Sequence, residues 1–214
     1  MGLVTALGWL NGLTAAEAER ALLPCCASTA WAGAVAAARP FGDPLEFRGA
    51  VDRALTDLTW ADIEEALSAH PRLGDQPAGT DRAAGTDRAA RADREAGADR
   101  AARWSRGEQA GVAAAGAGTR AALAAGNRAY EARFGHVYLA CATGRGGAEL
   151  LALLQSRLGN DPATERAVVR DELSKITWVR LGKLLAEAGE EPAETAATAG
   201  ETAPGEPGAP GAAG

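Results

Sequence analysis

The chain has 214 residues and a formal net charge of −6; 47% of its residues are hydrophobic, but only 5% are aromatic. Alanine supplies much of the hydrophobic fraction and favours helix, and no run of alternating β-branched residues indicates a sheet. Residues 189–214 contain five glutamates and no lysine or arginine, so the rest of the chain is nearly neutral. This composition predicts an all-α fold without the basic patch that nucleic-acid binding needs.

The cysteines, Cys25, Cys26 and Cys141, fit neither a disulfide framework nor a zinc motif. The sequence shows no basic segment followed by a long apolar run near its start, and no stretch of about 20 consecutive apolar residues. We therefore expect a cytoplasmic protein that has no metal site and does not contact a membrane.

In the first third of the chain, apolar residues at helical spacing predict three helical segments. They cover residues 11–35 with a break at Pro24, residues 44–58, and residues 60–70, where Pro71 ends the helix. Each start carries a residue that can cap a helix: Thr14, Ser28 or Thr29, Asp43 and Thr59.

Residues 75–103 have a different character, because Asp-Arg recurs there with a period of six and almost no large apolar side chain is present. Such a stretch lacks the side chains that anchor a chain to a core. We expect a low-complexity insertion that is flexible or transiently helical and bulges outward. Regular helix should return at Ser105 and continue to about Arg133.

The last third of the chain is predicted to contain a short buried segment and two helices. Residues 137–142 form an apolar run too short for a confident helix, which could be an extended segment in the core. A helix should follow over 146–158, and Asp161-Pro162 should cap another that reaches about Ala188. The helical domain is thus expected over 1–188, followed by a disordered acidic tail over 189–214.

His70 is the first of several residues that interrupt these patterns. It closes the apolar stripe of its helix after Ile63, Ala66 and Leu67, and Pro71 should force it out of helical geometry, which presents its ring at a turn. A side chain with an unperturbed pKa of about 6.5 suits proton transfer near neutral pH. The alternative is a structural histidine that caps the helix.

Two further groups carry polar side chains at positions that allow more than one interpretation. Ser105, Glu108 and Gln109 share one helical face, either as a capping box at a helix start or as a ligand site at a helix N-terminus. Arg180 continues the apolar stripe of the last helix and could snorkel, pair with a carboxylate or face a pocket. The glycines of residues 142–147 could form an anion-binding nest or a plain turn.

Taken in order, these motifs resemble those of the 2-oxo-4-hydroxy-4-carboxy-5-ureidoimidazoline (OHCU) decarboxylase family over roughly residues 10–188, less the insertion. The resemblance implies an all-helical homodimer without a cofactor, which releases CO2 from a urate breakdown intermediate to give (S)-allantoin. The matching segments are His-Pro-Arg-Leu-Gly at 70–74, Ser-x-x-Glu-Gln at 105–109, Phe-Gly at 134–135, Tyr-Leu-Ala-Cys-Ala at 138–142 and Ile-x-x-x-Arg-Leu at 176–181, with Trp31, Arg-Pro-Phe at 39–41, and Asn160-Asp161 with Glu165.

The resemblance assigns candidate roles to residues of this chain. It implies that His70 is the catalytic acid or base, and we expect Glu108 to assist it by accepting a hydrogen bond from the substrate or by fixing a tautomer. The residues expected to bind the substrate are Pro71, Ser105, Arg106, Gly107, Glu108, Gln109, Tyr138, Leu139, Ala140, Cys141, Ala142 and Arg180.

The chain departs from the family pattern in the insertion and at His136-Val137, where the family usually has an aromatic residue followed by proline. Two other functions stay open on the sequence alone. One is a cofactor-free hydrolase or isomerase of a related ureido compound, and the other is a helical interaction module without catalytic activity.

Overall fold

The computed structural model describes residues 2–74 and 88–190, and within these two ranges it contains helices and no strand. The expected all-α fold is confirmed. The helices are α1 (Gly2–Gly12), α2 (Ala15–Cys26), α3 (Thr29–Ala37), α4 (Pro44–Thr56), α5 (Trp60–Ser68), α6 (Arg88–Glu108), α7 (Ala110–Ala113), α8 (Ala117–Phe134), α9 (Gly147–Arg157) and α10 (Pro162–Glu190).

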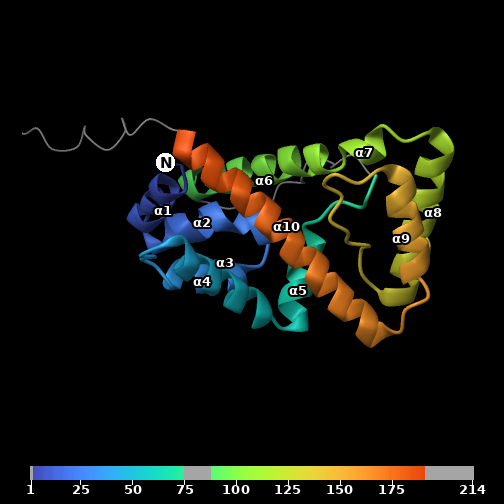
Figure 1. The fold of residues 1–214 in the computed structure, drawn as a ribbon, viewed down its shortest axis with the longest axis horizontal. Coiled ribbons are helices and arrows are strands. Elements are labelled where there is room, and N and C mark those ends of the chain that lie inside the picture. The colour runs from blue at the N-terminus through green and yellow to red at the C-terminus, as the bar shows by residue number, and fades with distance from the viewer. Residues whose placement is uncertain (1, 75–87, 191–214) are drawn as a thin grey trace, which may run out of the picture.

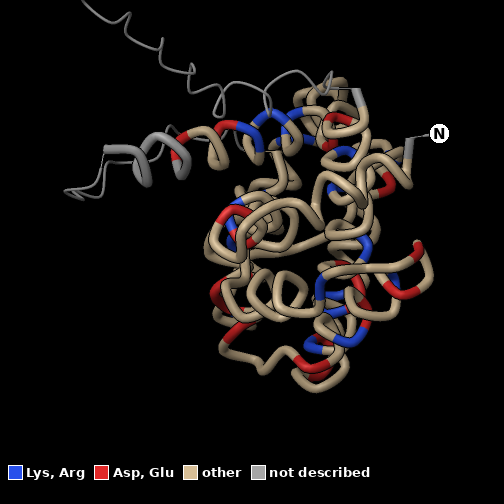
Figure 2. Tube along the Cα trace, turned by 90° about the vertical axis from the view of Figure 1, so that its left-hand side faces the viewer, with Lys and Arg blue, Asp and Glu red and all other residues tan. Residues whose placement is uncertain are grey.

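Helix α10 runs diagonally across the whole molecule and joins its two ends (Figure 1). Helices α1 to α4 lie at one end, where α10 packs against α1 and α2, and helices α7 to α9 lie at the other (Figure 1). Acidic and basic residues alternate along the described chain rather than gathering by sign (Figure 2).

Two hydrophobic clusters form the core on either side of residues 137–142. The first is built from α1 to α5 together with Trp104 and the apolar stripe of α10, and the second from α8, α9 and neighbouring loops. Residues 137–142 alternate between them, because Leu139 packs in the first cluster while Tyr138 and Ala140 pack in the second. Alternation with a period of two is typical of an extended chain, which confirms the expected buried extended segment.

Most of the predicted helix starts are confirmed by hydrogen bonds from the backbone to the capping side chain. The full capping box is present at Thr14 and at Thr59, and Ser28 caps α3. Asp43 caps α4 with Pro44 at its first position, and Asp161 accepts bonds from the first turn of α10. Helix α1 was not predicted; Arg39 donates to the carbonyls of Leu10 and Leu13 at its end, at 2.7 Å each.

The prediction that helix returns at Ser105 was wrong, because α6 already begins at Arg88 and ends at Glu108. Ser105 therefore lies in the last turn of α6 and caps no helix start. The second half of the predicted insertion is also anchored. A β-carbon at Gly97 would lie 3.4 Å from Cγ of Pro24 in α2, and Nε of Arg100 lies 3.3 Å from a carboxylate oxygen of Glu187 in α10.

The error has a physical cause, because a helix with few large apolar residues can pack through small side chains at close range and through ion pairs. The predicted uninterrupted helix to about Arg133 is also divided into the short α7 and the longer α8. Residues 75–87 of the predicted insertion and 191–214 of the predicted tail lie outside the described residues. In the described part of the chain, no helix is both long and apolar enough to cross a membrane.

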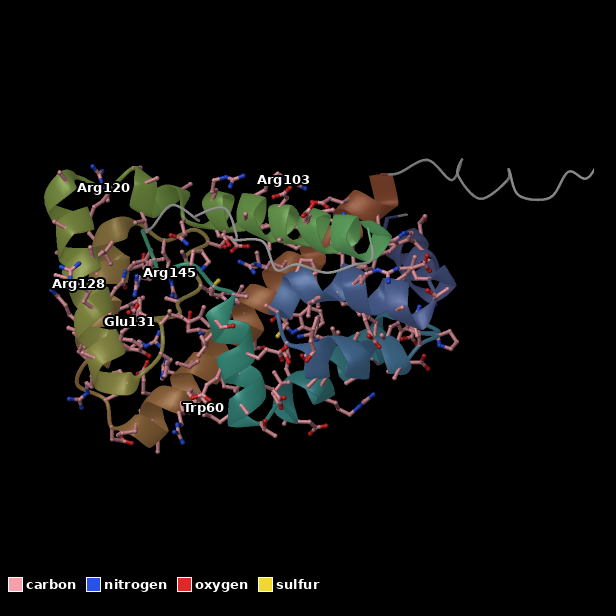
Figure 3. All side chains as sticks on the ribbon, turned by 180° about the vertical axis from the view of Figure 1, so that it is seen from behind. Trp60, Arg103, Arg120, Arg128, Glu131 and Arg145 are labelled. Carbon is pink, nitrogen blue, oxygen red and sulfur yellow. The ribbon has the colours of Figure 1, made fainter. Side chains whose placement is uncertain are left out.

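The anchoring of α6 predicts a large effect of Trp104→Ala on stability. Trp104 is 6% exposed and its Nε1 donates to Glu187 at 3.0 Å. Removing a buried tryptophan costs about 3–5 kcal/mol of unfolding free energy, which urea denaturation would measure. Arg103→Ala, at an exposed position on the same helix (Figure 3), should change it by less than about 0.5 kcal/mol. Equal, small effects of both variants would show that α6 does not pack as described.

Candidate active site

A pocket lies where the ends of α5 and α6 meet α10 and the extended segment 137–142. Its polar lining includes most of the side chains singled out by their pattern in the sequence. The lining residues are His70, Pro71, Leu73, Ser105, Glu108, Gln109, Tyr138, Leu139, Ala140, Ala142, Thr143, Ile176 and Arg180.

The ring of His70 is held in one orientation at the end of α5. The backbone N–H of His70 donates to Leu67, and Nδ1 lies 2.7 Å from the carbonyl oxygen of Ala66. A carbonyl can only accept a hydrogen bond, so Nδ1 carries the proton in this contact. The other ring nitrogen, Nε2, is buried and has no partner among the described residues, so its lone pair is available on the pocket side.

Burial keeps this imidazole neutral. The side chain loses the hydration that would stabilise its charged form, and the nearby Arg180 guanidinium adds repulsion, so the pKa of His70 falls to about 4. The bond to Ala66 and the Glu108 carboxylate act in the opposite direction but are weaker. The ring thus caps α5 through Nδ1, as the structural alternative expects, and its Nε2 is a hydrogen-bond acceptor at neutral pH.

Glu108 and Arg180 form a buried ion pair beside the histidine. Nε of Arg180 donates to one carboxylate oxygen at 3.2 Å and Nη2 donates to the other at 3.0 Å. The hydroxyl of Ser105 accepts from Nη2 at 2.9 Å, and the carbonyl of Pro24 accepts from Nη1 at 3.4 Å. Of the interpretations that the sequence left open for Arg180, two are observed: it pairs with the Glu108 carboxylate, and it lines the pocket.

The ionisation of Glu108 is secured by two cations. Burial alone would raise its pKa, but the hydrogen bonds and charges of Arg180 and Lys183 outweigh that effect and hold the pKa below its usual value. Nζ of Lys183 lies 2.9 Å from the carboxylate. Lys183 was not predicted as a site residue, although its position one turn beyond Arg180 places both on one face of α10.

The side chain of Gln109 stabilises the turn that follows His70 and Pro71. Its side-chain oxygen accepts the backbone N–H of Gly74 at 2.8 Å, and the amide of Asn127 donates to the carbonyl of Leu73 at 2.8 Å. Gly74 has a positive φ of 91°, a conformation that favours glycine. Among the described residues, the side-chain NH2 of Gln109 has no hydrogen-bond partner, and Gln109 lines the pocket.

The extended segment is fixed by two charged side chains because it has no neighbouring strand among the described residues. Nη1 of Arg157 donates to the carbonyl of Leu139, and the N–H of Cys141 donates to the carboxylate of Glu172, both at 2.7 Å. In an extended chain these two groups point to the same edge. The N–H and C=O of Ala140 therefore point to the opposite edge, where Ala140 lines the pocket.

Arg157 is itself held by a buried carboxylate. Glu165 is fully buried and accepts from Nε of Arg157 at 2.9 Å, from Asn160 at 2.7 Å and from the hydroxyl of Tyr130. The side chains of the Asn160-Asp161 and Glu165 motif thus join the end of α9 to the start of α10. This network sets the position of the pocket wall without entering the pocket.

Three residues predicted to bind a substrate do not line the pocket. Arg106 and Gly107 are exposed at the end of α6, and Cys141 contributes its backbone N–H to Glu172 on the opposite edge of its segment. These three residues belong to motifs that do line the pocket, but an extended chain turns alternate side chains away and a helix presents only residues three or four apart on one face. Conversely, three residues that were not predicted to bind the substrate do line the pocket: Leu73, Thr143 and Ile176. Each lies within a segment that the sequence had singled out, at 70–74, 142–147 and 176–181.

The glycines of residues 142–147 form a turn, the second of the two interpretations left open. Gly144 has φ of 77°, and the N–H of Arg145 donates to the carbonyl of Ala142 at 3.0 Å. A β-carbon on Gly111 would lie 2.1 Å from the carbonyl oxygen of Arg145, so α7 presses this turn against the pocket. Arg145 extends from the turn between α8 and α9 (Figure 3).

The departure at His136-Val137 does not alter the pocket lining. His136 packs edge-on against the rings of Trp60 and Tyr130, with ring centroids 5.4 and 5.5 Å apart. Neither His136 nor Val137 lines the pocket. Across residues 2–74 and 88–190, no group of three or more histidine, cysteine or acidic side chains is arranged to hold a metal ion.

The family model described as OHCU decarboxylase matches residues 11–182. The chain belongs to the OHCU decarboxylase family. The match covers every residue of the pocket, from His70 just after α5 to Arg180 on α10.

Curated relatives share about three tenths of the sequence. The chain is 31% identical over 164 residues to a 2-oxo-4-hydroxy-4-carboxy-5-ureidoimidazoline decarboxylase of Amia calva, with 76% of this chain and 81% of the relative covered. It is 29% identical over 171 residues to the uric acid degradation bifunctional protein TTL of Arabidopsis thaliana, with 79% and 48% covered. The chain thus spans about half the length of the Arabidopsis relative.

Solved structures share the fold. A crystal structure of OHCU decarboxylase in the presence of (S)-allantoin superposes with a TM-score of 0.60 at 26% identity and covers 78% of this chain and 98% of that one. A crystal structure of (S)-allantoin synthase superposes with a TM-score of 0.56 at 17% identity, with 83% and 53% covered. The second likeness concerns the fold alone.

The buried ion pair predicts that Glu108→Gln destabilises the protein. The variant keeps the side-chain shape but leaves the Arg180 charge uncompensated, and we expect a loss of about 1–3 kcal/mol of unfolding free energy at pH 7. Because the folded-state pKa of Glu108 is lowered, its contribution is present above the unfolded pKa of about 4.3 and disappears as the pH falls through the folded value. The stability gap between wild type and variant should therefore close in acid.

Chemical denaturation at pH 7 and pH 3 measures this gap. Glu149→Gln is a matched control, because Glu149 makes an exposed ion pair with Arg145 and should contribute less than about 1 kcal/mol. Equal stability of Glu108→Gln and wild type at pH 7 would contradict the buried pair.

Proposed function

We propose that this chain is a carboxy-lyase that converts 2-oxo-4-hydroxy-4-carboxy-5-ureidoimidazoline to (S)-allantoin and CO2 in urate degradation. The observation that carries the proposal is the neutral His70, whose Nε2 is unpartnered at a pocket that also contains Arg180. Membership of the OHCU decarboxylase family supports the choice of substrate.

The polar groups of the pocket match the groups of the substrate. Arg180 supplies positive charge for a carboxylate, and the backbone of Ala140 offers one donor and one acceptor for a ring amide or the ureido group. The free NH2 of Gln109 can donate to a carbonyl oxygen. These contacts would orient the substrate so that its reacting carbon faces the histidine.

The reaction can use the substrate's own imine as its electron sink. When the bond to the carboxylate breaks and CO2 leaves, the electron pair forms a carbon–carbon double bond with the former imine carbon. The electrons of the C=N bond move to the imine nitrogen, which takes up one proton from solvent water. The product of this step is an enol. The positive charge of Arg180 stabilises the negative charge that develops as the bond breaks.

His70 then completes the reaction as a base. Its Nε2 takes the proton from the enol hydroxyl, which becomes the ring carbonyl, and returns that proton to the former imine carbon, so that His70 is neutral again. The ring is fixed by the bond from Nδ1 to Ala66 and therefore acts from one side of the pocket. A proton delivered from that side to one face gives a single enantiomer of the product.

Two further proposals concern the state of the protein. We propose a homodimer, which the family resemblance supports, and a cytoplasmic location. The cysteines Cys25, Cys26 and Cys141 carry free thiols, as is usual in a reducing compartment, which supports the second proposal.

Replacement of the histidine tests the proposed activity. The substrate is generated from urate with urate oxidase and hydroxyisourate hydrolase, and circular dichroism follows the formation of optically active allantoin. His70→Asn, which keeps a polar side chain but cannot take up a proton, should lower kcat by a factor of about 100 or more. The wild-type rate should stay constant from pH 8 to pH 5 and fall only toward the pKa of about 4.

The far-ultraviolet spectrum of each variant provides the folding control, and His136→Asn is the matched substitution outside the pocket. A folded His70→Asn variant with nearly normal turnover would remove His70 from catalysis. A wild-type protein that does not accelerate the reaction would leave the hydrolase, isomerase or interaction module as the alternatives.

A further inference from the structure

Two cations and one carboxylate form the charged cluster of the pocket. Glu108 is 9% exposed at its side chain and Arg180 is 4% exposed, whereas Lys183 is 33% exposed and approaches the carboxylate from the solvent side of the pair. Arg180 and Glu108 alone would carry no net charge. Lys183 therefore leaves the cluster with one positive charge that no carboxylate in it balances.

The extra positive charge of the cluster can distinguish the substrate of the proposed reaction from its product, because the two molecules differ in charge. The substrate carries a carboxylate, whereas loss of CO2 leaves (S)-allantoin without one. A neutral cluster would distinguish the two molecules only by shape and hydrogen bonds. A positive cluster attracts the anionic substrate and gives the uncharged product no comparable gain.

We propose that Lys183 is a positioning residue that determines the preference of the site for the carboxylate-bearing substrate over the product. It does so through Glu108: Nζ of Lys183 neutralises the Glu108 carboxylate, which leaves the charge of the neighbouring Arg180 for the substrate. The inference deepens the proposed function and rests on it.

The contact pattern supports a role beyond an ordinary surface ion pair. Lys183 shares the carboxylate oxygen Oε1 with Nε of Arg180, at 2.9 and 3.2 Å respectively, so the two cations lie side by side on one face of α10. Like charges on neighbouring side chains repel each other, and the shared carboxylate offsets the repulsion. An anionic substrate bound at Arg180 would reduce the repulsion between Arg180 and Lys183 further, whereas a neutral product would not.

The expected effect is large enough to measure. At an effective dielectric constant of about 20, one charge within roughly 12 Å changes the affinity for an anion about tenfold. Removing Lys183 should therefore raise KM for the substrate about tenfold and leave kcat within about threefold, because His70 and Arg180 stay in place. The inhibition constant of (S)-allantoin should stay within about twofold of the wild-type value.

The experiment compares Lys183→Met, Lys183→Gln and Lys183→Arg with wild type, and measures KM, kcat and inhibition by (S)-allantoin for each. Lys183→Arg keeps the charge and should restore KM. The matched control is Arg166→Met, which removes an exposed cation from the same helix at the Trp60 ring, and it should behave as wild type. Thermal denaturation of each variant identifies any that do not fold.

Each outcome decides the inference. The inference is supported if KM rises in Lys183→Met and Lys183→Gln but not in Lys183→Arg, while the inhibition constant of (S)-allantoin is unchanged. An unchanged KM in these variants, or equal weakening of substrate and product binding, overturns it while the proposed function stands. If wild type itself does not accelerate decarboxylation, the proposed function fails and the inference fails with it.

Discussion

The hydrogen bond between Nδ1 of His70 and the carbonyl of Ala66 is the constraint on which the chemistry of this site depends. It forms because α5 ends at Ser68 and His70 lies about one turn beyond Ala66, so that the ring folds back onto the end of the helix. The bond fixes which nitrogen carries the proton, and burial keeps the ring neutral. Together they produce a base of fixed direction, which a histidine free in solution does not provide.

The fold brings the remaining groups to this ring through three chain segments that end or cross at one place. Helix α10 supplies Arg180 from its middle, α6 supplies Ser105 and Glu108 from its last turn, and residues 137–142 supply a backbone edge. Each of these is restrained by a partner outside the pocket, as Arg157 restrains Leu139. The geometry of the site is therefore a consequence of how the two hydrophobic clusters meet along α10.

Which residues form the site could be predicted from the sequence better than the burial and the long-range contacts of these residues. Capping patterns such as Thr59 with Asp62 located helix starts well, because a cap depends on neighbours a few residues away. The same local rule failed at Ser105, where a helix anchored by distant contacts runs through the apparent cap. The depressed pKa of His70 and the Lys183 contact could not be predicted either, since both depend on burial and on side chains far away in the sequence.

The central claim is that His70 is neutral and protonated at Nδ1, and NMR of protein labelled with ¹⁵N at histidine tests it most directly. The chain has only two histidines, so His136→Asn leaves the signals of His70 alone. Long-range proton–nitrogen correlations report the tautomer and its titration. We expect an Nδ1–H tautomer that stays neutral until the pH approaches the His70 pKa of about 4, and a change in the Nε2 chemical shift when (S)-allantoin binds. An Nε2–H tautomer, or titration near pH 6.5, would contradict it.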